Sequence, residues 1–320
     1  MHAIVAARAG GAEVLEYPEV DAPHAGPGEL LVESAVIGVN FIETYQRGGV
    51  YAVPFPFTPG AEAAGTVIAV GEGVADFAPG DRIATSAARG TYAEQFVVSA
   101  AEAAHVPEGV DFETAGALPL QGATAHYLAT SAARPRPGDT VLVHAGAGGV
   151  GLLLTQLLVD RGIRVLTTAS DDEKRRLSLE AGATASFGYE GFAERARRET
   201  DGEGVAVAYD GVGRDTFDGS LAALRVRGEL VLFGGASGQV PPFDLQRLNA
   251  GGSLSITRPT LGHFMRTAEE RSWRYRELFE AVAAGALRVR IGERFALADA
   301  AEAHRALEGR RTTGKVILLP

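Results

Sequence analysis

Three glycines in a short turn, Gly146, Gly148 and Gly151, are the residues of this sequence whose spacing most clearly suggests chemistry. A β-branched run, 140–143, precedes the turn and is typical of a strand, and the apolar run after it is typical of a helix. In that context the first glycine permits a tight turn, the second lets a pyrophosphate approach the backbone, and the third lets the helix pack closely on the strand. The pyrophosphate then lies at the helix N-terminus, where unpaired N–H groups and the helix dipole favour an anion. The turn is therefore interpreted as a dinucleotide site; an ordinary glycine-rich loop is the alternative, since the chain holds 41 glycines.

The end of the next expected strand, 163–168, selects between the two nicotinamide dinucleotides. A site that prefers NAD usually has an acidic residue about 20 residues past the glycines, which accepts a hydrogen bond from the ribose 2′-hydroxyl. Here the strand closes at Ser170 without a carboxylate, and Lys174 follows where it can face a 2′-phosphate. NADPH is therefore the expected cofactor. Asp171 and Asp172 oppose this choice, because a carboxylate would repel a phosphate; helix capping is their alternative role.

The elements around the glycine turn alternate between strand and helix from residue 140 to residue 256. Six strands are expected, at 140–143, 163–168, 184–187, 205–209, 229–233 and 253–256. This alternation predicts an α/β domain with a doubly wound, six-stranded parallel sheet, in which ligands bind beyond the carboxyl ends of the strands.

The first part of the chain has a different texture. Up to about residue 120 it consists of short strands separated by Gly- and Pro-rich turns, which predicts a barrel-like β domain. A short helix at 40–48 and a loop rich in Pro and aromatic residues, 51–59, interrupt the strands. With 320 residues the chain suits two domains: 1–122, completed by 266–320, and a dinucleotide-binding domain at 123–265.

Composition excludes several classes of function. The net charge of -10 argues against binding to nucleic acid, which needs a basic surface. No apolar run approaches the ~20 residues of a membrane span, and the N-terminus has no basic segment of a signal peptide, so we expect a cytoplasmic protein. The absence of cysteine excludes disulfides, thiolate nucleophiles and cysteine-bound metals. His144 and His126 are interpreted as packing residues rather than acids.

Several strings taken together carry a family resemblance. They are Asn40–Tyr45, Gly60–Gly65, Gly80–Arg82, Ala145–Gly151, Tyr209–Gly213, Phe233–Gly234 and Thr257–Pro259. Through them the sequence resembles the medium-chain dehydrogenase/reductase superfamily, and most closely its zinc-independent quinone oxidoreductases. The resemblance implies an N-terminal β-rich GroES-like domain and a Rossmann domain. It also implies a homodimer, in which the edge strand near 253–257 pairs with its copy, since an exposed edge is a template for such pairing.

No metal site is expected. Zinc-dependent relatives have a cysteine near the position of Asn40 and a Gly-His-Glu string where this chain has Gly60-Ala61-Glu62. A catalytic zinc needs about three N, S or O ligands, and neither the thiolates nor that histidine is present here. The seven histidines do not cluster at metal-binding spacing.

The resemblance also implies the site residues. Those expected to bind the cofactor are Asn40, Thr124, Gly148, Gly149, Val150, Ser170, Lys174, Tyr189, Phe233, Gly235, Ala236 and Arg310. Those expected to be catalytic, at the acceptor, are Asn40, Tyr45 and Tyr51. Asn and Tyr donate hydrogen bonds without a metal, so they can hold a carbonyl oxygen that gains charge. Relatives commonly have lysine where this chain has Gln121, which makes the acceptor end less cationic.

Three functions remain open. The first is NADPH-dependent reduction of quinones, by one or two electrons. The second is NADPH-dependent reduction of an activated C=C bond in an alkenal or 2-enoyl thioester, because Tyr51 aligns with the tyrosine of the 2-enoyl thioester reductases. A thioester would favour a basic approach surface, and the arginines at 266, 271, 274 and 276 are candidates for it. The third is a non-catalytic NADPH-binding structural or RNA-binding protein, which the acidic composition disfavours for RNA.

Overall fold

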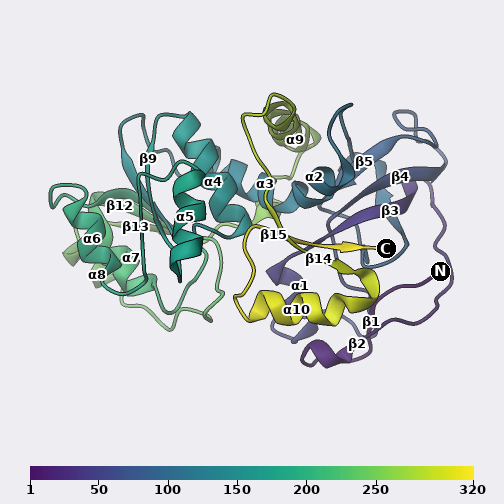
Figure 1. The fold of residues 1–320 in the computed structure, drawn as a ribbon, viewed down its shortest axis with the longest axis horizontal. Helices are drawn as coiled ribbons and strands as arrows, with labels where there is room; N and C mark the ends of the chain where they lie inside the picture. The colour runs from purple at the N-terminus through teal and green to yellow at the C-terminus, as the bar shows by residue number, and fades with distance from the viewer. The chain divides into compact units, whose positions relative to one another are not determined.

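The computed structural model describes all residues from 1 to 320. The chain forms two compact units, one of residues 1–123 and 267–320 and the other of residues 124–266 (Figure 1). No helix is both long enough and apolar enough to cross a membrane. We call the unit of residues 1–123 and 267–320 the β-rich unit, and the unit of residues 124–266 the Rossmann unit.

A seven-stranded sheet organises the β-rich unit, with the order β14-β15-β3-β4-β5-β7 and with β6 paired to β3. Its strands are β3 (Glu29–Val39), β4 (Ala63–Val70), β5 (Arg82–Thr85), β6 (Gln95–Ser99), β7 (Ala104–His105), β14 (Ile291–Ala296) and β15 (Lys315–Leu319), and a small separate sheet pairs β1 (Val5–Ala6) with β2 (Leu15–Glu16). The last strand, β15, pairs antiparallel with β3. The C-terminal segment is therefore an integral part of the sheet that the N-terminal residues build.

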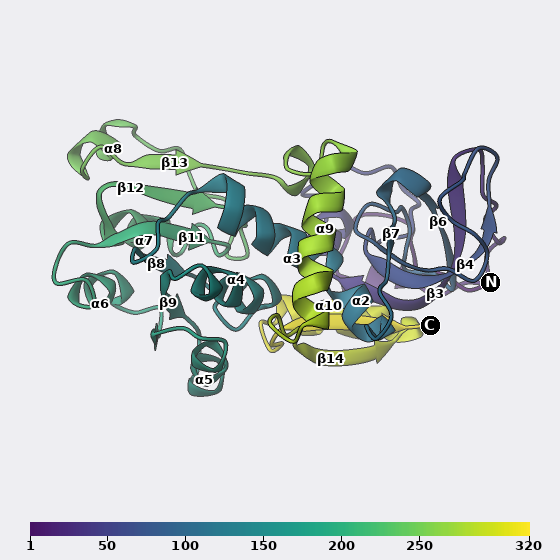
Figure 2. The ribbon, with the colours of Figure 1, turned by 90° about the horizontal axis from the view of Figure 1, so that it is seen from above.

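The β-rich unit also contains helices. They are α1 (Phe41–Arg47), α2 (Phe112–Ala117), α9 (Ala268–Ala283) and α10 (Ala300–Glu308). Helix α10 packs on β14 and β15, and α2 packs on β3 and β4. Figure 2 shows α9 as one uninterrupted helix, and Thr267 caps it by accepting a hydrogen bond from the N–H of Glu270 at 3.2 Å.

The Rossmann unit contains a six-stranded sheet with the order β10-β9-β8-β11-β12-β13, in which all pairs are parallel. Its strands are β8 (Thr140–Val143), β9 (Arg164–Thr168), β10 (Ala185–Phe187), β11 (Val205–Asp210), β12 (Leu224–Leu232) and β13 (Ser255–Thr257). The strand order reverses between the neighbours β8 and β11. This confirms the doubly wound sheet and places its switch point beside the glycine turn.

The helices of the Rossmann unit connect successive strands. They are α4 (Gly149–Asp160), α5 (Asp172–Glu180), α6 (Phe192–Arg198), α7 (Phe217–Ala223) and α8 (Gln246–Ala250). Helix α4 contacts α5, and α6 contacts α7. Buried Leu142, Ala208 and Leu230 belong to one cluster with Phe192 and Phe217, so the apolar strands and helices share a core. Helix α8 lies beside β13 at one end of the sheet (Figures 1 and 2).

The connection into the Rossmann unit is helical. It consists of helix α3 (Pro119–Tyr127), which a π-helical turn, 128–132, ends. Proline is favoured at the first helical position for two reasons. An N–H at this position has no partner within the helix, so its absence costs nothing, and the fixed φ of proline suits the helix. Pro119 therefore defines the start of α3.

Candidate active site

The first and third glycines of the turn are required by close packing. A Cβ on Gly146 would lie 2.6 Å from Cβ of Thr167 on β9, and a Cβ on Gly151 would lie 2.4 Å from the carbonyl oxygen of Ala145. Real Cβ atoms do not approach that closely, so neither position accepts a side chain. Gly146 therefore lets the turn lie close against β9, and Gly151 lets α4 lie close against the turn. The sequence predicted a close-packing role for Gly151 and a tight turn for Gly146.

The second glycine has a single close neighbour, a backbone oxygen. Gly148 precedes α4 with φ -76° and ψ 166°, and a Cβ there would meet only the carbonyl oxygen of Ala145, at 3.2 Å. Gly148, Gly149 and Val150 are half-buried. The first turn of a helix has N–H groups without partners within the helix, so this turn fits a pyrophosphate.

Asp171 and Lys174 lie together at the end of β9. The carboxylate of Asp171 caps α5 by accepting from the backbone N–H of Lys174 at 2.9 Å, and it also accepts from Oγ of Ser170 at 2.9 Å. These hydrogen bonds, the backbone one first, hold the pKa of Asp171 below its ordinary value. Nζ of Lys174 lies 3.2 Å from Oγ of Ser170. The capping role considered for Asp171 is therefore confirmed, and an ammonium stands beside the hydroxyl.

The other residues expected at the 2′-phosphate come from two places. Tyr189 follows β10, the neighbour of β9, and its half-buried ring stacks on the ring of His144 with centroids 6.3 Å apart. Arg310 is exposed and follows α10 in the β-rich unit, with φ 54°. Ser170, Lys174 and Tyr189 therefore stand at the carboxyl ends of two adjacent strands of the Rossmann sheet.

The residues expected at the nicotinamide half lie in the loop after β12. Phe233, Gly235 and Ala236 are half-buried there. A Cβ on Gly211, in the loop after β11, would lie 2.8 Å from the ring of Phe233. The Tyr209–Gly213 string therefore needs a glycine at this position in order to admit the aromatic ring. Thr124 is buried on α3.

A buried polar group surrounds Asn40 in the β-rich unit. Asn40, Glu62 and Lys315 have exposed fractions of 4%, 0% and 1%. Oδ1 of Asn40 accepts from Nζ of Lys315 at 2.6 Å, and its Nδ2 donates to Glu62 at 2.9 Å. The Lys315 ammonium also pairs with the Glu62 carboxylate, whose other oxygen accepts from the N–H of Leu120 at 2.7 Å. Because opposite charges hold its two ends, the Asn40 carboxamide has one fixed orientation.

Glu43 adjoins this group from the first turn of α1. One oxygen of its carboxyl accepts from the N–H of Asn40 at 2.6 Å, while the other oxygen, Oε1, is buried without a hydrogen-bond partner. Burial raises the pKa of Glu43 to about 8, against the lowering effect of the Lys315 ammonium. Glu43 is therefore mainly protonated at neutral pH.

The two tyrosines expected at the acceptor contact each other. The rings of Tyr45 and Tyr51 meet edge to face with centroids 5.6 Å apart, and the N–H of Tyr51 donates to the carbonyl of Tyr45 at 3.2 Å. Tyr51 is 41% exposed. Nε2 of Gln121 lies 3.5 Å from Oδ1 of Asn40, so Gln121 borders the Asn40 group.

Lys315 was not predicted as a site residue. It is the single cation at the start of an apolar strand, β15, which is the one signal that sequence offers, since a buried lysine normally needs a partner. Its partners, Asn40 and Glu62, precede it by more than 250 residues.

Comparison with known proteins places the chain in a family. Residues 26–134 match the family model of the alcohol dehydrogenase GroES-like domain, and residues 181–318 match that of the zinc-binding dehydrogenases. A quinone oxidoreductase of Pseudomonas aeruginosa is 44% identical over 97% of both chains. This chain belongs to the quinone oxidoreductase family. The resemblance to this branch of the medium-chain dehydrogenase/reductases, an oxidoreductase family, is thereby confirmed.

The names of two further relatives indicate a cofactor and a second kind of substrate within the family. A mycobacterial protein solved as a complex with NADPH is 52% identical, with a TM-score of 0.98 over 100% of both chains. A 2-haloacrylate reductase of a Burkholderia species is 38% identical over 99% of this chain and 98% of its own.

The residues around Asn40 do not fit a zinc ion, although one matching family is described as zinc-binding. The chain has no cysteine, and no group of three or more His, Cys, Asp or Glu residues is placed to hold a metal. Oxygens of Asn40 and Glu62 already contact the Lys315 ammonium. A zinc ion needs about three N, S or O ligands, and a divalent cation here would not find them. It would also face the positive charge of Lys315.

Proposed function

We propose that this protein is an NADPH:quinone oxidoreductase that works without a metal. The observation that carries the proposal is the strand end at Ser170, where Asp171 is engaged in capping α5 and the Lys174 ammonium lies 3.2 Å from the Ser170 hydroxyl. An ammonium and a hydroxyl side by side suit a 2′-phosphate better than a 2′-hydroxyl. The names of the relatives support the acceptor class, and the mycobacterial NADPH complex supports the cofactor.

The bound cofactor would be held along its whole length. When bound, NADPH supplies a hydride from its nicotinamide ring. The first turn of α4, at Gly148, Gly149 and Val150, would donate its N–H groups to the pyrophosphate. The residues assigned to the 2′-phosphate are Ser170, Lys174, Tyr189 and Arg310, and those assigned to the nicotinamide half are Asn40, Thr124, Phe233, Gly235 and Ala236.

Asn40, Tyr45 and Tyr51 are the residues that we assign to the acceptor. A carboxamide nitrogen carries two N–H donors, and Nδ2 of Asn40 uses one on Glu62 at 2.9 Å. The second is available for an oxygen that gains negative charge. Because Lys315 holds Oδ1 of Asn40 at 2.6 Å, this donor keeps its direction, and a preorganised donor stabilises developing charge best.

Steady-state oxidation of NADPH by a small quinone tests the proposal. We expect turnover with NADPH and a strong preference over NADH. Losing one charge-assisted hydrogen bond costs about 1.5–3 kcal/mol, so Lys174→Ala should reduce the ratio of kcat/KM values, NADPH over NADH, about 10- to 100-fold. Arg175→Ala is the matched control, because Arg175 lies next to Lys174 on α5 but pairs with Asp172. Absence of turnover with NADPH, or an equal effect of both variants, would contradict the proposal.

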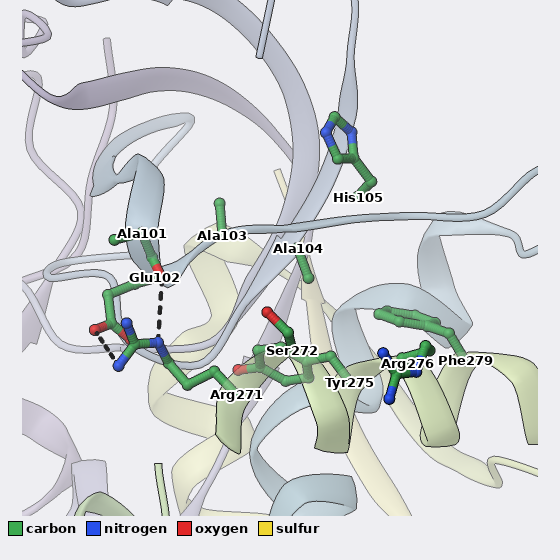
Figure 3. Close-up of a pocket in the computed structure, with 10 residues that line it drawn as sticks. All are labelled: Ala101, Glu102, Ala103, Ala104, His105, Arg271, Ser272, Tyr275, Arg276 and Phe279. Carbon is green, nitrogen blue, oxygen red and sulfur yellow. Dashed lines mark hydrogen bonds and ion pairs between the residues drawn. The ribbon is translucent and has the colours of Figure 1, made fainter. Parts of the chain in front are cut away.

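Reduction of an activated C=C bond is the second candidate, and the haloacrylate reductase relative supports it. The basic surface considered for a thioester is partly used for internal contacts. Figure 3 shows Arg271 beside a pocket of the β-rich unit, ion-paired with Glu102 and donating to the carbonyl of Ala101 at 3.1 Å. Arg274 is buried, with its guanidinium 4.7 Å from the centre of the Trp273 ring. A small acrylate or alkenal is therefore a better second acceptor than a thioester.

The same assay decides between the acceptors. A quinone, a 2-haloacrylate, an alkenal and an enoyl thioester are compared at equal concentration. The proposal expects the largest kcat/KM for the quinone, and a larger value for the acrylate would make C=C reduction the main activity. Tight binding of NADPH without turnover of any acceptor would favour the non-catalytic alternative.

We also propose a cytoplasmic homodimer that pairs through β13. This strand is at the edge of the six-stranded sheet, and the same unit exposes Val226, on the neighbouring β12, and Leu245, just before α8, each by 70%. Light scattering of the purified protein should give the mass of a dimer, and Val226→Asp should shift it toward the monomer. Leu179→Asp, an exposed leucine on α5, is the control that should leave the mass unchanged.

A further inference from the structure

Asp210, the last residue of β11, is the centre of a buried hydrogen-bond network in the Rossmann unit. Its exposed fraction is 0%. Its Oδ1 accepts from the backbone N–H groups of Val212 and Gly213 at 2.8 and 2.9 Å. Two hydroxyls supply the other donors, that of Thr216, the N-cap residue of α7, and that of Ser220 on α7. Oγ1 of Thr216 and Oγ of Ser220 each lie 2.8 Å from Oδ2. The carboxylate therefore fixes the start of the loop after β11 and ties it to α7.

His144 extends the network to two more strands, and the direction of each hydrogen bond follows. Because a carboxylate only accepts, Ser220 donates to Asp210, and Nε2 of His144 must then donate to Ser220, at 2.9 Å. Burial lowers the pKa of His144, against the charge of Asp210, so the imidazole is neutral. Its Nδ1 therefore accepts from Oγ1 of Thr168 at 2.7 Å. One directed chain thus joins the ends of β9, β8 and β11.

The loop after β12 is hydrogen-bonded to the loop that Asp210 fixes, and it packs closely against that loop. The N–H of Phe233 donates to the carbonyl of Asp210 at 2.9 Å, and the N–H of Ala236 donates to the carbonyl of Gly211 at 3.2 Å. Gly213 has φ 91°, and a Cβ there would lie 3.0 Å from Cα of Gly235. The three residues of the loop after β12 that we assign to the nicotinamide half, Phe233, Gly235 and Ala236, are therefore each in contact with residues 210–213.

We propose that Asp210 is a positioning residue for the nicotinamide half of the cofactor, acting through residues 211–213 on Phe233, Gly235 and Ala236. Ser220 and His144 hold the carboxylate and complete the network. The proposal rests on the proposed binding of NADPH by this unit. Since Ser170 and Lys174 lie after β9 and bond to each other and to Asp171, the 2′-phosphate end should be independent of Asp210.

Two ligands separate positioning from a general loss of structure. Dissociation constants of NADPH and of adenosine 2′,5′-bisphosphate, which lacks the nicotinamide, are measured for the full-length protein and its variants. We expect Asp210→Ala to weaken NADPH about tenfold, equal to about 1.4 kcal/mol, while the affinity for the bisphosphate changes less than about twofold. Asp210→Asn keeps an acceptor for Val212 and Gly213, and Ser220 can turn its proton to the carbonyl of Thr216, 2.9 Å away. This variant should recover most of the NADPH affinity.

A destabilised control variant separates the effect of lower stability from the effect of lost positioning. Leu221→Ala removes buried apolar contacts from α7, the helix that also carries Ser220, without touching the network. It should lower the Tm while leaving the ratio of the two dissociation constants at the wild-type value. Equal weakening of both ligands by Asp210→Ala, or the same ratio in Asp210→Ala and Leu221→Ala, would overturn the inference. Failure of the wild-type protein to bind NADPH would instead overturn the proposed function.

Discussion

Replacing Lys315 by methionine removes the one cation that faces the buried carboxylate of Glu62. In the native protein the ammonium pairs with Glu62 and donates to Oδ1 of Asn40 at 2.6 Å. Methionine matches the length of the lysine stem without its charge. The variant therefore leaves Glu62, which is 0% exposed, as an uncompensated charge in the interior.

The magnitude follows from the burial of both partners. Removing one partner of a buried ion pair costs about 3–5 kcal/mol, whereas replacing both partners by neutral groups of similar size is often close to neutral. The double variant Glu62→Gln/Lys315→Met still loses the donor to Asn40, about 1 kcal/mol. We therefore expect a loss of about 3–5 kcal/mol for the single variant and of about 1–2 kcal/mol for the double variant.

Denaturant unfolding followed by tryptophan fluorescence measures this loss of stability in the β-rich unit. The chain has one tryptophan, Trp273, and it lies on α9 of the β-rich unit that also holds Lys315. Both variants should also lower kcat with the quinone, because the amide of Asn40 loses its fixed orientation. A single variant as stable as the double variant would show that Lys315 does not compensate a buried charge on Glu62, and a double variant with wild-type kcat would show that Lys315 does not orient Asn40.

Three further predictions concern the turn and the buried titratable groups. Gly151→Ala should abolish NADPH binding in a fluorescence titration, because its Cβ would lie 2.4 Å from the Ala145 carbonyl; retained affinity would contradict the close packing of α4. Burial, aided by the nearby Arg47, lowers the pKa of His304 from 6.5 to about 3, so the unfolded state takes up a proton first and the free energy of unfolding should fall by about 1 kcal/mol between about pH 6.5 and 5.5. His304→Gln should remove this slope, and an unchanged slope would exclude His304. Glu43 acts in the opposite sense, since its pKa rises from 4.5 to about 8: stability should decline by about 1 kcal/mol per pH unit between about pH 5 and 7, and Glu43→Gln should flatten that decline. A steeper decline in the variant would contradict the assignment.

The local features of the Rossmann unit were predictable from sequence. The β-branched run at 140–143 is strand β8, and Gly151 after it has the close-packing role that its spacing indicated. These features depend on neighbours in sequence and on hydrophobic period, which one sequence displays. His144 was expected to be a satisfied packing residue, and both of its ring nitrogens are hydrogen-bonded.

Other features depend on contacts between distant segments. Strand β14 was not expected, because none of its residues is buried and it pairs only with β15, so its sequence lacks a clear apolar alternation. The contact of Lys315 with Asn40 and Glu62 joins three strings that are far apart in the chain. Asp210 stood within a motif of the resemblance, but the link from its partner Ser220 to His144, just after β8, appears only once the sheet order brings β8 beside β11.

Anaerobic stopped-flow mixing of the NADPH-loaded protein with a small quinone, before and after dialysis against a metal chelator, tests the central proposal most directly. We expect rapid loss of NADPH absorbance, one hydroquinone formed per NADPH, and the same rate in both samples. A rate no faster than the reaction without protein, or a rate that disappears on chelation and returns with zinc, would contradict it.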